Sequence, residues 1–309
     1  MATDYDVLIL GAGPAGLTAG IYAARARRTV LILDTGTVGG QTVLTDRVAN
    51  YPGVAETSGR ALSQTMASQA RSFGCEVTPF ARLSGVDLTG EVKSVTYRDG
   101  RRATARAVIV ATGGVPRQLG VDNEERLVGR GISFCATCDG EFFTDRPIAV
   151  IGGGNSALEE AVSLSRYASR VTIIHEFDHF QAEPWIVAEA RANQKIHLLM
   201  NQRVLGFVGD AGLAGVRSRD QSSGDVTETA VDGCFVFVGY VPHSSLFAGQ
   251  LALSERGEVL TDDALRTDQP GVFAAGDVRQ TRVRQITTAV ADGTVAALSA
   301  LDYLNEDTS

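Results

Sequence analysis

Lysines, cysteines and long apolar segments are scarce in this chain, and each scarcity excludes a class of function. Of its 28 basic residues only Lys93 and Lys195 are lysines, they form no cluster, and the net charge is −8. Such a chain is unsuited to nucleic acid or an anionic membrane surface as a partner. The N-terminal apolar run stops at Gly11 without a basic region before it, and no later run could span a bilayer. We therefore expect a cytoplasmic protein.

The chain has four cysteines and no secretory signal, which suggests a reducing cytoplasm, where a close pair indicates redox chemistry or metal binding more often than a structural disulfide. Cys135 and Cys138 lie in the segment FCATCDG, where two sulfurs can meet across one turn. A helix that begins at the pair would lower the pKa of one thiol, and the adjacent Asp139 could relay a proton. A zinc site would need two more ligands, and the pair His175 and His179 spans a strand end rather than one helical face. No metal is therefore predicted.

Two segments share the plan of buried strand, glycine-rich turn, amphipathic helix, buried strand and acidic residue. They cover residues 6–34 and 147–176. The plan is typical of a βαβ unit that binds the pyrophosphate of a dinucleotide at the helix N-terminus and a ribose hydroxyl at the acid. One such motif is weak evidence, but two copies that both end in an acid favour two dinucleotide sites. The motif residues are Gly11, Gly13, Gly16 and Asp34 in the first copy, and Gly152, Gly154, Ala157 and Glu176 in the second.

Glycine and proline interrupt the strand patterns at residues 113–116 and 239–242, and they predict two linkers. One domain is then discontinuous and consists of residues 1–114 and 242–309. The other, residues 115–241, is inserted in it and carries the cysteine pair. The predicted fold is α/β, with two Rossmann-like dinucleotide-binding domains.

The chain resembles the low-molecular-weight thioredoxin reductase family over essentially its whole length. The motifs GAGPAGL, GGQ, ANYPG, VIVATG, CATCDG, GGGNSA and FAAGDV occur in the family's order, and CATCDG between two dinucleotide units is highly specific. The resemblance implies a thioredoxin reductase-like homodimer in which the first domain binds FAD and Cys135 and Cys138 exchange electrons with it. It also implies a thioredoxin-like or other dithiol/disulfide partner protein, which would contact Arg130, Phe142 and Phe143.

The same resemblance assigns a set of FAD-binding residues to the discontinuous domain. A helix that begins after Gln285 would also stabilise the negative charge of reduced flavin. The residues implied are Gly11, Gly13, Ala15, Gly16, Asp34, Gly39, Gln41, Asn50, Ala111, Gly113, Gly276, Asp277, Arg284, Gln285 and Ile286.

The second dinucleotide site departs from the family pattern. NADPH-dependent members read HRR and then another arginine four residues later, which bind the 2′-phosphate, whereas this chain has Glu176, Phe177 and Gln181. Each lost attraction or added repulsion is worth roughly 4 kcal/mol at about 4 Å and an effective dielectric near 20, before screening. NADPH is therefore not expected as the electron donor. The residues predicted to line this site are Gly152, Gly154, Asn155, Ser156, Glu176, Phe177 and Trp185.

Three occupants of the second site stay open on the sequence alone. Phe177, His179 and Trp185 suggest a large flat ring and therefore a second FAD, as in the diflavin-linked disulfide oxidoreductases, which the chain also resembles. NADH suits Glu176 equally well, and the aromatic residues could simply fill the space of the missing arginines. An empty site would require another donor such as ferredoxin, but the intact glycine turn weighs against it. A flavin-bound redox sensor without turnover is a further alternative, and the cysteine pair with Asp139 argues against it.

Overall fold

The computed structural model describes residues 3–45 and 48–306, which form two compact units. Unit 1 takes in the described residues up to Val115 and those from Val241 onward. Unit 2 runs from Pro116 to Tyr240.

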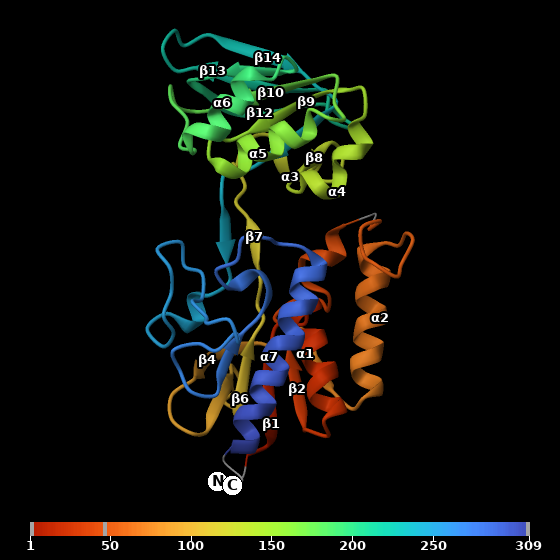
Figure 1. Ribbon diagram of the computed structural model, residues 1–309, viewed down its shortest axis with the longest axis vertical. Helices are drawn as coiled ribbons and strands as arrows, with labels where there is room; N and C mark the ends of the chain where they lie inside the picture. Colours follow the sequence, from red (N-terminus) through yellow and green to blue (C-terminus); the bar gives the residue numbers. More distant parts are fainter. Residues whose placement is uncertain (1–2, 46–47, 307–309) are drawn as a thin grey trace. The chain divides into compact units, whose positions relative to one another are not determined.

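The chain passes from one unit to the other in two extended segments, β7 (Gly114–Pro116) and β16 (Tyr240–Pro242), which pair with each other (Figure 1). Gly113 and Gly239 precede these strands, and their φ angles of 60° and 123° turn the chain in a way that favours glycine. The domain limits expected from the sequence, after residues 114 and 241, fall within this pair of strands.

The parallel strands of unit 1 form the centre of its sheet, and antiparallel strands extend it on one side. The parallel strands follow the order β3 (Glu76–Thr78), β2 (Val30–Leu33), β1 (Tyr5–Leu10), β6 (Arg102–Val110) and β17 (Val272–Ala274). The antiparallel strands, which begin next to the first half of β6, are β5 (Lys93–Tyr97) and β4 (Leu83–Asp87). All of β2 and the last four residues of β1 are buried and apolar, as expected for parallel strands covered on both faces.

The long helices of unit 1 are α1 (Pro14–Arg25), α2 (Gly59–Ser72) and α7 (Ile286–Glu306), and α1 lies directly against α7 (Figure 1). A glycine makes this contact possible, since a Cβ atom on Gly293 would lie 2.2 Å from the carbonyl oxygen of Ala15. The short helices are η1 (Gly40–Leu44), η3 (Ser245–Phe247) and η4 (Gly276–Val278). Within residues 3–45 and 48–306, no helix is both long and apolar enough to cross a membrane.

Unit 2 combines a parallel sheet with a smaller antiparallel one. The parallel strands follow the order β11 (Ile196–Leu199), β10 (Arg170–Ile174), β9 (Pro147–Ile151), β15 (Gly233–Val236) and β8 (Ile132–Ser133). The antiparallel strands are β12 (Gln202–Val208), β13 (Gly215–Asp220) and β14 (Val226–Ala230). The helices are α3 (Glu124–Leu127), α4 (Ala136–Asp139), η2 (Gly140–Phe143), α5 (Asn155–Leu164) and α6 (Pro184–Ala192).

Both repeats seen in the sequence have the same βαβ form in the structure. The first consists of β1, α1 and β2, and the second of β9, α5 and β10, and in each the two strands are parallel neighbours. The carboxyl end of the first strand therefore leads into the helix N-terminus in both units.

The contact between α1 and α7 leads to a prediction for Gly293→Ala. The added methyl group would meet a backbone oxygen, which cannot move aside, so the free energy of unfolding should fall by about 1–3 kcal/mol. Gly20→Ala is the matched control, because its new Cβ would lie 2.5 Å from Cδ1 of Ile32, the flexible end of a side chain. Urea denaturation measures both. Equal stability of Gly293→Ala and the unmodified chain would contradict this account of the contact.

Candidate redox site and dinucleotide sites

Cys135 and Cys138 are joined by a disulfide in unit 2, with 5.3 Å between their Cα atoms, so the predicted pairing is confirmed. Strand β8 ends at Ser133, and Cys135 is the residue from which α4 begins. Both cysteines are half-buried. Partial exposure is what thiol–disulfide exchange with another molecule requires.

A buried hydroxyl group connects the disulfide to Asp139. Ser133 is 7% exposed, and its Oγ donates a hydrogen bond to Oδ2 of Asp139 at 2.6 Å and accepts one from the amide of Cys135 at 3.0 Å. The amide of Asp139 donates to the carbonyl oxygen of Cys135 at 3.2 Å. The carboxylate is thereby held on the same turn as the cysteines, where it can exchange a proton with a sulfur. Ser133 was not predicted from the sequence, although a polar residue at the end of a buried strand can indicate a functional side chain.

The glycine turn of unit 1 leaves the N-terminus of α1 open to a ligand. Gly11 has a φ of 113°, and a Cβ atom on it would lie 2.1 Å from the carbonyl oxygen of Ala111. Gly13 is the N-cap residue of α1, and no atom lies within 4 Å of the place its Cβ would take. A Cβ on Gly16 would lie 1.9 Å from the carbonyl oxygen of Gly11. The helix amides can therefore be approached closely, as binding of a pyrophosphate requires.

Asp34, which follows β2, stabilises this turn through its carboxylate. Its Oδ2 accepts from the amide of Ala12, and its Oδ1 accepts from the amide of Gly36, both at 2.7 Å. Each carboxylate oxygen can accept a second hydrogen bond, so a ribose hydroxyl can still be bound. Asp34 thus has a structural role that was not predicted, beside the ribose contact that was.

The predicted residues Gly39 and Gln41 lie at the segment that folds onto the glycine turn. The amide of Gly39 donates to the carbonyl oxygen of Ala12 at 2.8 Å. A Cβ on Gly40 would lie 3.4 Å from Cα of Gly13, which places this segment beside the open N-terminus of α1. Gln41 is exposed there, in η1. The segment therefore borders the open N-terminus of α1.

The turn that contains Gly276 and Asp277 is held in place by α7. Asp292 on α7 accepts hydrogen bonds from the amide of Gly276 at 3.0 Å and from Nε of Arg279 at 2.7 Å. Gly276 has a φ of 75°, and a Cβ on it would come within 3.0 Å of Cβ of Ala15. Asp292 and Arg279 were not predicted, because their contact depends on how the turn folds back onto α7.

The remaining predicted FAD contacts precede α7 or follow β6. Arg284 forms an ion pair with Glu258 at 2.5 Å, a partner that was not predicted. Nδ2 of Asn50 donates to Oε1 of Gln285 at 3.4 Å, and Ile286 is the first residue of α7. The others, after β6, are the buried Ala111 and the half-buried Gly113.

These segments of unit 1 together fit FAD. They provide a helix N-terminus with open space above an N-cap glycine, and an acid for a ribose. They also provide a second helix N-terminus, that of α7, for the charge of a reduced flavin. Two of the predicted FAD-binding side chains already have partners within the chain, since Asp34 accepts from the amide of Ala12 and Arg284 pairs with Glu258.

The glycine turn of unit 2 has the same construction. Gly152 has a φ of 134°, and a Cβ on it would lie 2.3 Å from the carbonyl oxygen of Phe237. Gly154 is the N-cap residue of α5, and the nearest atom to its Cβ position is 3.9 Å away. Asn155 and Ser156 begin α5 and are exposed. This helix N-terminus is therefore also open to a pyrophosphate.

Of the residues that stand in place of the family's arginines, Gln181 lies beside this second turn. The amide of Gln181 donates to the carbonyl oxygen of Gly153 at 2.9 Å. Glu176 lies two residues after the end of β10 and is exposed. Phe177 is 44% exposed and Trp185 is 58% exposed, so neither ring fills the core of unit 2.

Of the residues matched to the partner contact, Phe142 is the most suitable. Phe142 is 42% exposed and Arg130 is exposed, both in unit 2. Phe143 instead packs edge-on against the buried Phe235, with 5.5 Å between ring centroids. Phe143 is therefore mainly a packing residue.

The two other cysteines are buried and unreactive. Cys75 is 5% exposed and Cys234 is fully buried. Burial raises the pKa of the Cys75 thiol to about 11, and it also raises the pKa of Cys234, to which the Glu124 carboxylate contributes. Among residues 3–45 and 48–306, no three histidine, cysteine or acidic side chains are arranged to hold a metal ion.

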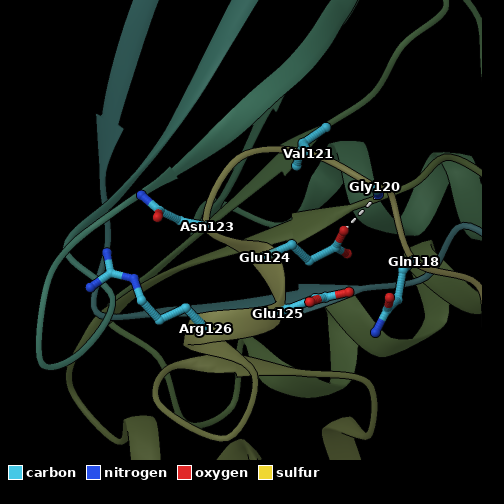
Figure 2. A pocket seen from close by; sticks show the side chains of 7 residues that line it. All are labelled: Gln118, Gly120, Val121, Asn123, Glu124, Glu125 and Arg126. Atoms are coloured by element: carbon cyan, nitrogen blue, oxygen red, sulfur yellow. Dashed lines mark hydrogen bonds between the residues drawn. The ribbon is translucent and has the colours of Figure 1, made fainter.

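A polar pocket of about 620 Å³ lies in unit 2 apart from the cysteine pair (Figure 2). Its most buried acid is Glu124, whose carboxylate accepts from the amides of Leu119 at 2.9 Å and Gly120 at 2.7 Å. The carboxylate of Glu124 thus stabilises the backbone of the loop before α3, and this role accounts for its burial. The lining residues are Gln118, Gly120, Val121, Asn123, Glu124, Glu125 and Arg126.

Comparison with known proteins identifies the family of this chain. The model of the pyridine nucleotide-disulphide oxidoreductase family matches residues 5–293. The chain belongs to this family. It is 41% identical to the thioredoxin reductase of Peptoclostridium acidaminophilum over 313 residues, with 98% of each chain covered. It is 43% identical to that of Streptomyces coelicolor over 307 residues, covering 98% of this chain and 95% of the other.

The solved structures agree with this assignment. The crystal structure of thioredoxin reductase from Streptococcus pyogenes matches with a TM-score of 0.91 at 39% identity, and 98% of both chains is covered. The predicted α/β fold with two Rossmann-like dinucleotide-binding domains is confirmed. As a pyridine nucleotide-disulphide oxidoreductase of the thioredoxin reductase type, the chain is a flavin disulfide oxidoreductase, which confirms the predicted enzyme class.

The contact between Ser133 and Asp139 predicts the behaviour of Ser133→Ala. Dithiol–disulfide turnover should fall about tenfold or more. A hydrogen bond to a charged group contributes about 1.5–3 kcal/mol, and about 1.4 kcal/mol is tenfold in rate. Turnover should be measured with a small dithiol.

Two further variants control this measurement. Ser133→Thr keeps a hydroxyl group and should retain most of the turnover, while Ser169→Ala removes an exposed hydroxyl from the same unit. If Ser133→Ala and Ser169→Ala behaved alike, Ser133 would have no part in the reaction.

Proposed function

We propose that this flavin disulfide oxidoreductase passes electrons between a thioredoxin-like partner and FAD held by unit 1, through Cys135 and Cys138. We further propose that the second dinucleotide site does not use NADPH and holds a second FAD. The observation that carries this proposal is the exposed carboxylate of Glu176 at the end of the second βαβ unit.

Glu176 argues against NADPH by charge and by position. The acid at the end of the second strand of a βαβ unit is the group that hydrogen-bonds the 2′-hydroxyl of the adenosine ribose. A carboxylate accepts a hydrogen bond from a free 2′-hydroxyl but repels a 2′-phosphate. Gln181, bonded through its amide to Gly153, adds no positive charge. A dinucleotide without the 2′-phosphate is therefore favoured.

The exposed aromatic residues favour FAD over NADH at this site. Phe177 and Trp185 are large and half exposed, and they lie four residues on either side of Gln181, whose amide is bonded to the turn. A ligand with a flat ring could cover both side chains. A stacked isoalloxazine ring gains about 0.5–1.5 kcal/mol per well-placed aromatic beyond its buried area. NADH is the second candidate, because Glu176 suits its ribose equally well.

Residues of both units support the reaction. FAD, when bound, supplies a two-electron carrier. In unit 1 the open N-terminus of α1 would bind the pyrophosphate of FAD, and Asp34 would orient its adenosine ribose. In unit 2 a thiol of the partner attacks one sulfur of the Cys135–Cys138 disulfide and gives its proton to the Asp139 carboxylate. A mixed disulfide forms, and the other sulfur leaves as a thiolate, which can take that proton from Asp139. The second thiol of the partner then displaces the remaining cysteine, so the partner leaves as a disulfide and Cys135 and Cys138 are left as the dithiol that would reduce FAD.

Cys138→Ser tests the role of the cysteine pair. Without the second sulfur the intramolecular disulfide cannot form, so dithiol–disulfide turnover should fall to the background rate while the FAD of unit 1 stays bound. Cys75→Ala, which alters a buried free thiol in unit 1, is the control and should keep its turnover. A Cys138→Ser variant with normal turnover would remove the pair from the mechanism.

Reduction of the bound flavin tests the donor. Anaerobic mixing with NADPH should bleach the flavin slowly, whereas a small dithiol should bleach it readily. Rapid bleaching by micromolar NADPH would contradict the proposal, and rapid bleaching by NADH would favour the second candidate. Bleaching by reduced ferredoxin alone would assign that donor instead.

Glu176→Arg should increase the rate with NADPH by about tenfold or more, because the charge next to the 2′-phosphate is reversed. Glu189→Arg makes the same change at an exposed position of α6 and serves as the control for net charge. Equal rates for the two variants would show that Glu176 does not face a ribose.

A further inference from the structure

His175 is a buried residue whose backbone is fixed at the end of β10. It is 4% exposed, its amide donates to the carbonyl oxygen of Leu199 at 2.9 Å, and its own carbonyl oxygen accepts from the amide of Gln202 at 2.8 Å. Nε2 of its ring lies 3.0 Å from the carbonyl oxygen of His179. A carbonyl oxygen only accepts, so Nε2 carries the hydrogen.

The ring of His175 lies against the middle glycine of the second dinucleotide turn. A Cβ on Gly153 would lie 2.3 Å from Cε1 of the ring and 2.4 Å from each ring nitrogen. These nearly equal distances place Gly153 over the face of the imidazole. Gly153 is not among the glycines with a positive φ, so its backbone would accept an alanine. A glycine is needed here because of the ring and not because of the backbone.

The ring of His175 also contacts the segment that follows β10. Phe180 stacks on His175 with 5.6 Å between centroids and 19° between planes, and Phe177 meets it edge-on at 5.4 Å. Burial lowers the pKa of His175, which keeps the ring neutral among these aromatic neighbours. The ring therefore contacts the glycine turn and three residues of the segment 176–181.

A backbone connection runs parallel to the one through the ring. The amide of Gln181 donates to the carbonyl oxygen of Gly153, and Gly154 and Gln181 form a parallel bridge. The segment 176–181 is thus tied to the turn at its far end by the backbone and at its near end by the imidazole.

We infer that His175 is a positioning residue. Its ring fixes the distance between the segment that bears Glu176 and Phe177 and the glycine turn of the second dinucleotide site. The inference rests on the proposed function of that site. A dinucleotide bound there touches the turn with its pyrophosphate and the segment with its ribose, so both contacts form together only if the two are held in register. Specificity at this site then depends on a residue that does not touch the ligand.

Gly153→Ala and His175→Ala, alone and combined in the full chain, test the inference without any ligand. Amide hydrogen exchange in the segment 176–183 should become about tenfold faster in each single variant. The double variant should exchange no faster than His175→Ala, because the added methyl group occupies the space of the missing ring. Unchanged exchange in both single variants, or fully additive effects in the double variant, would overturn the inference.

Trp185, the single tryptophan of the chain, reports on ligand binding at the same site. After exhaustive dialysis, FAD or NADH is added and quenching of the Trp185 fluorescence is followed. Each single variant should bind about tenfold more weakly than the unmodified chain, with the double variant within about twofold of His175→Ala. His175→Phe keeps the ring but loses the donor to His179 and should show an intermediate loss. His197→Ala, an exposed histidine on β11, should bind normally.

The two measurements separate the inference from the function on which it rests. No quenching of the unmodified chain by FAD or NADH would contradict the proposed second site, and hydrogen exchange would still decide the role of His175. Normal binding and normal exchange in folded Gly153→Ala and His175→Phe would reject the positioning role while leaving the proposed function intact.

Discussion

Both dinucleotide sites depend on a glycine whose α-carbon packs against a carbonyl oxygen of a neighbouring strand end. Gly11 approaches Ala111 in this way in unit 1, and Gly152 approaches Phe237 in unit 2, where a Cβ atom would lie 2.1 Å and 2.3 Å from the oxygen. This contact holds the turn between the first strand and the helix of each βαβ unit against the end of the neighbouring strand. The helix N-terminus then points into open space above a second glycine, and any larger side chain would close the site.

The two sites differ in how their acidic residues are used. The Asp34 carboxylate already accepts two backbone hydrogen bonds and belongs to the framework of its turn. Glu176 is exposed, and its carbonyl oxygen accepts from Nε2 of Gln221. In unit 2 the ring of His175 fills the space beside Gly153. If Glu176 contacts a ribose as proposed, unit 2 separates the group that holds the turn from the group that selects the ribose.

The sequence predicted the features that depend on local spacing. The two βαβ units, the disulfide between Cys135 and Cys138 and the α/β class follow from short motifs, and the structure and the family membership agree with them. The residue-level roles in cofactor binding stay predictions. The sequence did not reveal the contact of Asp292 with Gly276 or that of Glu258 with Arg284, because both depend on how the intervening chain folds back and follow no local spacing pattern. Ser133 lies close to its partners in sequence, but only the return of α4 toward β8 brings its hydroxyl to Asp139.

If both sites hold a flavin as proposed, acid release of FAD from purified, FAD-supplemented protein, quantified against peptide absorbance, should give two FAD molecules per chain. Glu176→Arg should give one per chain, with unit 1 unaffected. A single FAD in the undegraded, supplemented protein would contradict the proposal.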